Sequence, residues 1–115
     1  MSFPSRKIGR KEVASVMKSG KFKGSNYLSL KFIPFIGPSH FFFVVSKKVS
    51  KLAVERNLIK RRSRAIINLN KDNIKSGFIC VMMFKPEVKD LSFDQLVDEI
   101  KSVLIATGIL NNNHV

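Results

Sequence analysis

The chain has few residues from which to build a covalently or metal-held scaffold. It contains one cysteine, two histidines, one tyrosine and no tryptophan among 115 residues. A single cysteine excludes an intrachain disulfide and a cysteine-based zinc site. The position of Cys80 inside an apolar strand pattern predicts an inert core residue. We therefore expect a domain held by packing, with no metal or cofactor bound by protein ligands.

Catalytic constellations and long apolar runs are also missing from the sequence. It has no paired histidines and no pattern of a Cys–His dyad, and several carboxylates gather near the last predicted helix, away from the basic residues. No stretch approaches the roughly 20 apolar residues that span a bilayer. The basic N-terminus has no apolar segment of a secretory signal. We expect a cytoplasmic protein with no catalytic residues of its own and no membrane partner.

Positive charge, by contrast, is abundant and confined to one half of the chain. The net charge is +13, and residues 1–64 carry 16 Lys and Arg against 2 Asp and Glu, whereas residues 65–115 carry 5 against 6. Such a half repels itself unless an anionic partner neutralises it. Solubility alone would not require this clustering.

The apolar periodicity predicts one α+β domain over residues 1–115, in the order α-β-β-β-α-β-α. The continuous apolar runs at 40–46 and 78–84 indicate interior strands, and as flanks of one helix they are expected to be parallel neighbours in a roughly four-stranded mixed sheet. Residues 1–9 and 109–115 are expected to be flexible. The predicted helices cover 10–19, about 52–69 and 92–107, and the other predicted strands cover 21–23 and 26–33.

The segment from Lys47 to Arg64 carries eight Lys or Arg among its eighteen positions. Winding it at about 100° per residue separates a cationic arc from an apolar arc. A helix packed on one side and cationic on the other presents a rigid row of donors to a polyanion. Lys47, Lys48 and Lys51 add positive charge at the start of this row. Arg62 falls outside the row and is expected to be solvated. The cationic arc holds Arg56, Asn57, Lys60, Arg61 and Arg64, and the expected packed arc holds Val54, Leu58, Ile59, Ala65, Ile66 and Leu69.

This helix and its surroundings resemble the protein subunit of bacterial ribonuclease P. The hallmark of that family is an Arg-Asn-x-x-Lys-Arg helix after a strand that ends in Ser-Lys-Lys. Here Ser46-Lys47-Lys48 ends the strand, and Arg56, Asn57, Lys60 and Arg61 carry the helix motif. The resemblance covers about residues 6–105 and includes Lys18-Ser19-Gly20, Lys85-Pro86 and Leu91-Ser92-Phe93.

The resemblance implies a non-catalytic subunit of a ribonucleoprotein endonuclease. The RNA subunit and its magnesium ions would remove the 5′ leader of precursor tRNA. The protein would bind the ribonuclease P RNA and the leader and assist substrate and magnesium binding. The resemblance also implies a left-handed β-α-β crossover around the basic helix, and no obligate protein partner is expected.

In the family, a cleft between the first helix and the sheet holds the leader, and aromatic side chains often line it. The matching positions here are Val13 and Met17 on the helix and Lys31 on the facing strand, with Lys18 nearby. None of them stacks as an aromatic ring does, so Val13 and Met17 are equally consistent with a purely structural role.

Two further positions depart from the family pattern. Leu58 replaces a common second arginine, so it is expected to exchange an RNA contact for packing. Phe41, Phe42 and Phe43 are bulkier than the usual strand, where a glycine often stands at the middle position.

Two other functions share the charge pattern. A structural RNA-binding protein of ribosomal type would look the same but would not enhance cleavage. A DNA-binding regulator would place the basic helix in the major groove. The DNA-binding function is disfavoured because a helix-turn-helix needs a partner helix before the basic helix, and a strand is predicted there instead.

Overall fold

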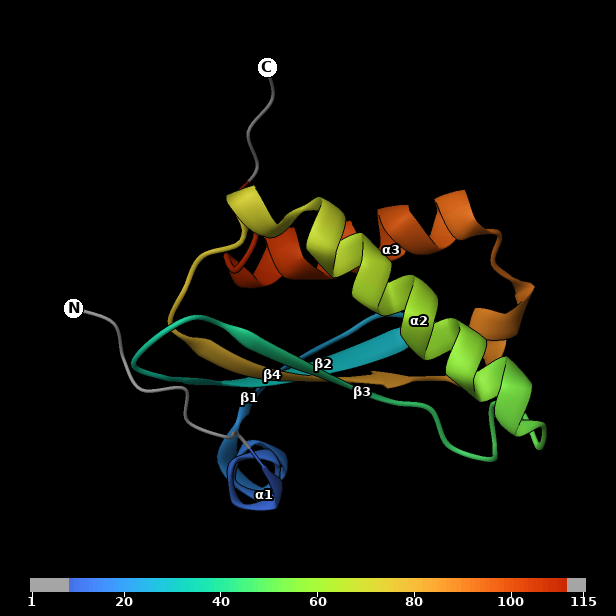
Figure 1. The fold of residues 1–115 in the computed structure, drawn as a ribbon, viewed down its shortest axis with the longest axis horizontal. Coiled ribbons are helices and arrows are strands. Elements are labelled where there is room, and N and C mark those ends of the chain that lie inside the picture. The colour runs from blue at the N-terminus through green and yellow to red at the C-terminus, as the bar shows by residue number, and fades with distance from the viewer. Residues whose placement is uncertain (1–8, 112–115) are drawn as a thin grey trace.

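Three helices cover the two faces of one four-stranded sheet in the computed structural model, which describes residues 9–111. Figure 1 shows α2 and α3 together on one face of the sheet and α1 on the other. The order of the elements is the predicted one, with two short 3-10 turns added at Lys71–Asn73 and Pro86–Asp90. The elements are α1 (Arg10–Ser19), β1 (Lys21–Gly24), β2 (Leu28–Pro34), β3 (His40–Val44), α2 (Ala53–Leu69), β4 (Phe78–Phe84) and α3 (Phe93–Thr107).

Strand β4 lies at the centre of the sheet, whose order is β1-β2-β4-β3. It pairs antiparallel with β2 and parallel with β3, so the predicted parallel pairing of the two apolar runs is confirmed. The prediction that β3 is an interior strand is wrong, because β3 forms an edge. Its residues are apolar because helices cover parts of both its faces: Phe41 and Phe43 pack with the α2 and α3 core, and Phe42 packs on the α1 side.

The connection from β3 through α2 to β4 has the unusual hand. In Figure 1 both strands run from left to right, β3 lies in front of β4, and α2 passes above them. This path is a left-handed crossover, as the resemblance implied, whereas right-handed connections are the general rule.

Alternation along the strands divides the core into two clusters. On one face, Leu30 and Met82 pack with α2 and α3, and on the other, Val81 packs with Val16 of α1. Cys80 is fully buried among the first cluster, and this burial raises the pKa of its thiol to about 12. The side chain is therefore a neutral core residue at physiological pH, as predicted.

Helix α2 is rotated about its axis by about a quarter turn from the orientation predicted from the positions of its apolar residues. Ser63 and Ile66 are its buried residues, and Ile59 packs against the same core, whereas Val54 is 74% exposed and Leu69 is 77% exposed. The assignment of Val54 and Leu69 to the packed arc is therefore wrong, and Ala65 is exposed as well. Serine is tolerated at the contact because it is small and its Oγ donates to the Ile59 carbonyl at 2.8 Å.

The helix ends follow local capping rules. Ser92 and Gln95 form a capping box at the start of α3, and Gly108 ends that helix with φ of 80°, a conformation that favours glycine. The C-terminal segment expected to be flexible, residues 109–115, is ordered at its start. Ile109 and Leu110 are buried, so a flexible region does not begin at residue 109. Residues 1–8 and 112–115, which were also expected to be flexible, lie outside the described residues.

Among residues 9–111, every helix is too short or too polar to cross a bilayer.

The rotation of α2 can be tested by comparing two leucine-sized side chains on it. Ile66→Ala should lower the free energy of unfolding by about 3 kcal/mol, because it leaves a cavity in the core. Leu69→Ala should change it by less than about 0.5 kcal/mol, because the side chain is already in water. Urea denaturation measures both, and equal losses would place Leu69 in the core and contradict this orientation.

Candidate nucleic-acid interface

The turn between β3 and α2 projects lysines because its apolar residues point inward. Val45 and Val49 are buried, and the Val49 amide donates to the Ser46 carbonyl at 3.0 Å. Lys47 and Lys48, which lie between them, are exposed. The predicted basic entry to the helix is therefore present on the surface, fixed by two buried valines.

Ser50 joins this turn to the first residues of α2. It is buried, its hydroxyl donates to the Glu55 carboxylate, and the Leu52 amide donates to the same hydroxyl at 3.1 Å. Nη1 of Arg56 donates to the Ser50 carbonyl at 2.9 Å. Arg56 is thus half-buried and holds the turn against the helix, rather than standing free on the cationic arc. A guanidinium has five N–H donors, so it retains others for a phosphate.

The outward row of α2 consists of Asn57, Arg61 and Arg64, all exposed, with Lys60 half-buried beside them. Spacings of three and four residues put successive members about 4.5–6 Å apart along the helix, comparable with neighbouring phosphates. Within residues 9–111 no carboxylate forms a salt bridge with these cations. Their charge is therefore not neutralised by a carboxylate of the described residues.

Two neighbours of this row behave differently. Arg62 is exposed and points away from it around the helix, as expected of a solvated residue. Leu58 is half-buried, in keeping with packing in place of an RNA contact.

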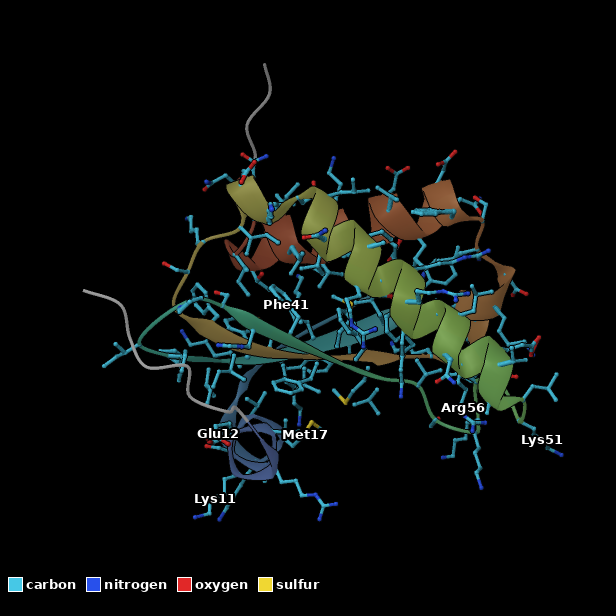
Figure 2. All side chains as sticks on the ribbon, in the orientation of Figure 1. Lys11, Glu12, Met17, Phe41, Lys51 and Arg56 are labelled. Atoms are coloured by element: carbon cyan, nitrogen blue, oxygen red, sulfur yellow. The ribbon has the colours of Figure 1, made fainter. Side chains whose placement is uncertain are left out.

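The second predicted surface lies between α1 and the sheet. Val13 is half-buried and packs against the cluster around Val16. Met17 is 38% exposed at the rim, and Lys18 is exposed next to it. Nζ of Lys31 donates to the Met17 carbonyl at 2.9 Å, which ties β2 to the C-terminal end of α1. Figure 2 shows Met17 on α1 beneath the sheet, on the opposite side from the body of α2.

An aromatic side chain near this surface was missed from the sequence. Phe22 is paired directly with Lys31 across β1 and β2, so both point to the α1 face, and Phe22 is 61% exposed. The signal is the alternation of these two strands. Only the pairing register, which the sequence does not specify, places the ring beside the lysine.

The described residues contain no group of three His, Cys, Asp or Glu side chains positioned to hold a metal ion. The described surface offers guanidinium and ammonium donors on α2 and its turn, and a smaller mixed surface on α1.

Comparison with known proteins agrees with this geometry. The family model for ribonuclease P matches residues 6–107. The ribonuclease P protein component of Phytoplasma australiense is 39% identical over 105 residues, which cover 90% of each chain. The corresponding protein of Microcystis aeruginosa is 34% identical over 77 residues, 67% of this chain and 64% of the relative, which is less than two thirds of its length.

The fold has solved counterparts as well. The ribonuclease P protein of Staphylococcus aureus superimposes with a TM-score of 0.84 at 22% identity, over 95% of this chain and all of the other. That likeness concerns the fold, whereas the sequence matches concern the family. The chain belongs to the ribonuclease P protein family.

Proposed function

We propose that this chain binds the 5′ leader of precursor tRNA while its α2 surface holds the ribonuclease P RNA, which removes the leader by endonucleolytic cleavage. The observation that carries this proposal is the row of exposed cations on α2, unpaired within residues 9–111 and mounted on a buried helix face. A preorganised row of this kind binds phosphates without first having to order itself.

The α2 surface favours folded RNA for electrostatic reasons. Folding an RNA brings phosphates together, and the repulsion between them must be reduced by cations. Arg61 and Arg64 present planar forks that match phosphate oxygens, and Lys47 and Lys48 add point charges. Each phosphate neutralised releases counterions, which makes binding favourable and dependent on salt.

The α1 surface fits a single strand more than a duplex. Met17 offers apolar contact, and Phe22 offers a ring that stacks with any base. Lys18 and Lys31 are the cations of this surface that would contact the phosphates of the bound strand. These contacts carry little sequence information, which suits a leader of variable sequence.

The proposal assigns both the cleavage chemistry and the magnesium ions to the RNA subunit. The protein raises the effective affinity of that RNA for magnesium by reducing phosphate repulsion around it, and it holds the substrate by its leader. A cytoplasmic location, expected from the sequence, stays a prediction.

Cleavage of precursor tRNA tests this function. Adding the chain to ribonuclease P RNA should speed single-turnover cleavage at low magnesium, and the difference should narrow as magnesium is raised. Magnesium substitutes for the protein cations in reducing repulsion, so the two should compensate. Binding to the RNA without faster cleavage at any magnesium concentration would favour the structural, ribosomal-type RNA binder instead.

Alanine variants of Arg56 and Arg61 should distinguish a residue that also stabilises the fold from one that contacts only RNA. Arg61→Ala should make the slope of log affinity against log salt shallower by about 0.9 or less, the share of one phosphate contact, with unchanged stability. Arg56→Ala should also weaken binding, and it should cost about 1 kcal/mol of stability because its hydrogen bond to Ser50 is lost. Arg62→Ala serves as the control and should change neither quantity. Indistinguishable salt slopes for Arg61→Ala and Arg62→Ala would remove the outward row from the RNA interface.

Met17→Phe should tighten binding to a leader-bearing precursor by about fivefold or more, because a ring adds a stacking surface that methionine lacks. Mature tRNA, which has no leader, provides the matched ligand, and its affinity should not change. Affinities measured for the holoenzyme decide the matter: an equal gain for both tRNAs would place Met17 outside the leader path.

A further inference from the structure

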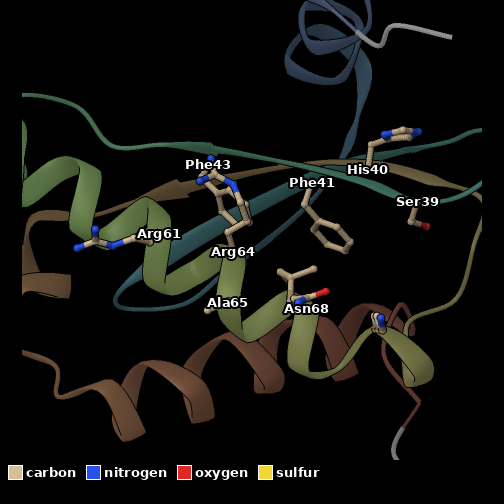
Figure 3. A pocket seen from close by; sticks show the side chains of 10 residues that line it. Ser39, His40, Phe41, Phe43, Arg61, Arg64, Ala65 and Asn68 are labelled. Atoms are coloured by element: carbon tan, nitrogen blue, oxygen red, sulfur yellow. The ribbon is translucent and has the colours of Figure 1, made fainter. Parts of the chain in front are cut away.

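A groove lies between the edge strand β3 and the C-terminal half of α2, on the side of the sheet opposite α1. Its volume is about 640 Å³, which is enough for a nucleotide. Figure 3 shows Phe41 pointing from β3 toward α2, the Arg64 side chain reaching from α2 to Phe43, and Asn68 on the helix below Phe41. The groove lies at the edge of the sheet, where β3 has no strand neighbour beyond it.

The floor of the groove is aromatic and its rim carries a guanidinium. Cζ of Arg64 lies 5.8 Å from the ring centroid of Phe43, within the range of a cation–π contact. This contact holds the side chain of an otherwise exposed arginine at one position. A planar cation held beside an aromatic ring is the arrangement on which unpaired bases stack.

The charge of the groove has one sign. Arg61, Arg64 and Lys71 line it, and no carboxylate is among the lining residues. Arg61 and Arg64 come from α2 and Lys71 from the 3-10 turn after it, so cations from two segments line the same groove as Phe41 and Phe43. A nucleotide matches this lining, because it offers a flat base to the rings and phosphates to the cations.

Polar groups of the groove fall into two kinds. The Ser39 hydroxyl is already engaged: it donates to the Lys75 carbonyl at 2.6 Å and accepts from the Phe78 amide at 3.1 Å. His40 lines the groove by its backbone, because its ring points away from α2 and packs against Phe35. Asn68 is exposed at the rim, and its amide offers both a donor and an acceptor to a base edge.

We propose that this groove binds one unpaired nucleotide of the ribonuclease P RNA, with its base against Phe43 and Arg64, its edge near Asn68 and its phosphates on Arg61 and Lys71. The nucleotide belongs to the ribonuclease P RNA rather than to the leader, because Arg61 and Arg64 are shared with the outward row of α2 and the leader surface lies across the sheet. Such a site rests on the function proposed above. A second copy of the chain along the free edge of β3 is disfavoured, because both copies carry a net charge of +13.

Replacing Arg64 by lysine isolates the stacking contribution, because the charge is kept and the planar group is lost. Arg64→Lys should weaken binding to ribonuclease P RNA by about tenfold, the loss expected for one stacked base, without changing the salt slope. Arg62→Lys makes the same exchange on the other side of α2 and should bind as the unaltered protein does. Both positions are exposed, so neither variant should compromise folding.

Nucleotide-resolution probing identifies the ligand. Acylation of RNA 2′-hydroxyls, with and without the protein, should show one unpaired nucleotide that is protected by the unaltered protein and by Arg62→Lys but released in Arg64→Lys. Phe43→Leu should release the same nucleotide, and its melting temperature checks that the variant is folded.

Unchanged affinity and protection in Arg64→Lys would overturn the nucleotide site, and so would a loss of affinity with no single nucleotide released. Failure of the unaltered protein to bind this RNA at all would instead contradict the function on which the site rests.

Discussion

The surface chemistry of this protein depends on how α2 packs on the sheet. Ile59, Ser63 and Ile66 face the core, and that contact sets the rotation of the whole helix. Because the backbone of a helix is rigid, fixing three inward residues also fixes the direction of every cation on it. Arg61 and Arg64 face solvent for this reason, and Arg56 falls at the boundary, where it bonds to the turn that leads into the helix.

The sheet separates two exposed surfaces of different chemistry, which the proposed function assigns to different RNA ligands. On the α2 face, a basic row and a groove present fixed charge and aromatic rings; on the α1 face, Met17, Phe22 and Lys31 form a smaller and less charged surface. Central strand β4 is shared by both clusters of the core, with Met82 packing on one side and Val81 on the other. Alternation along β4 thus holds the α1 face and the α2 face in a fixed relation.

Much of the fold was predictable because its signals are local. The capping box at Ser92, the glycine at 108 and the alternation along 28–34 each depend on neighbours within a few residues. The errors came from non-local packing. β3 resembles an interior strand because helices cover both its faces, and Leu69 resembles a core residue because it is apolar, although no element of the fold covers it.

Composition and residue spacing were enough to predict a polyanion as ligand, to place the positive charge before residue 65 and to identify the family, because none of these depends on how the chain folds. Which cations are exposed and which are held by hydrogen bonds became visible in the folded chain alone. The fold gave Arg56 to the turn, placed Phe22 beside Lys31, and opened a groove between β3 and α2. Those outcomes depend on strand register and helix rotation, which are set by the packing of residues far apart in the chain.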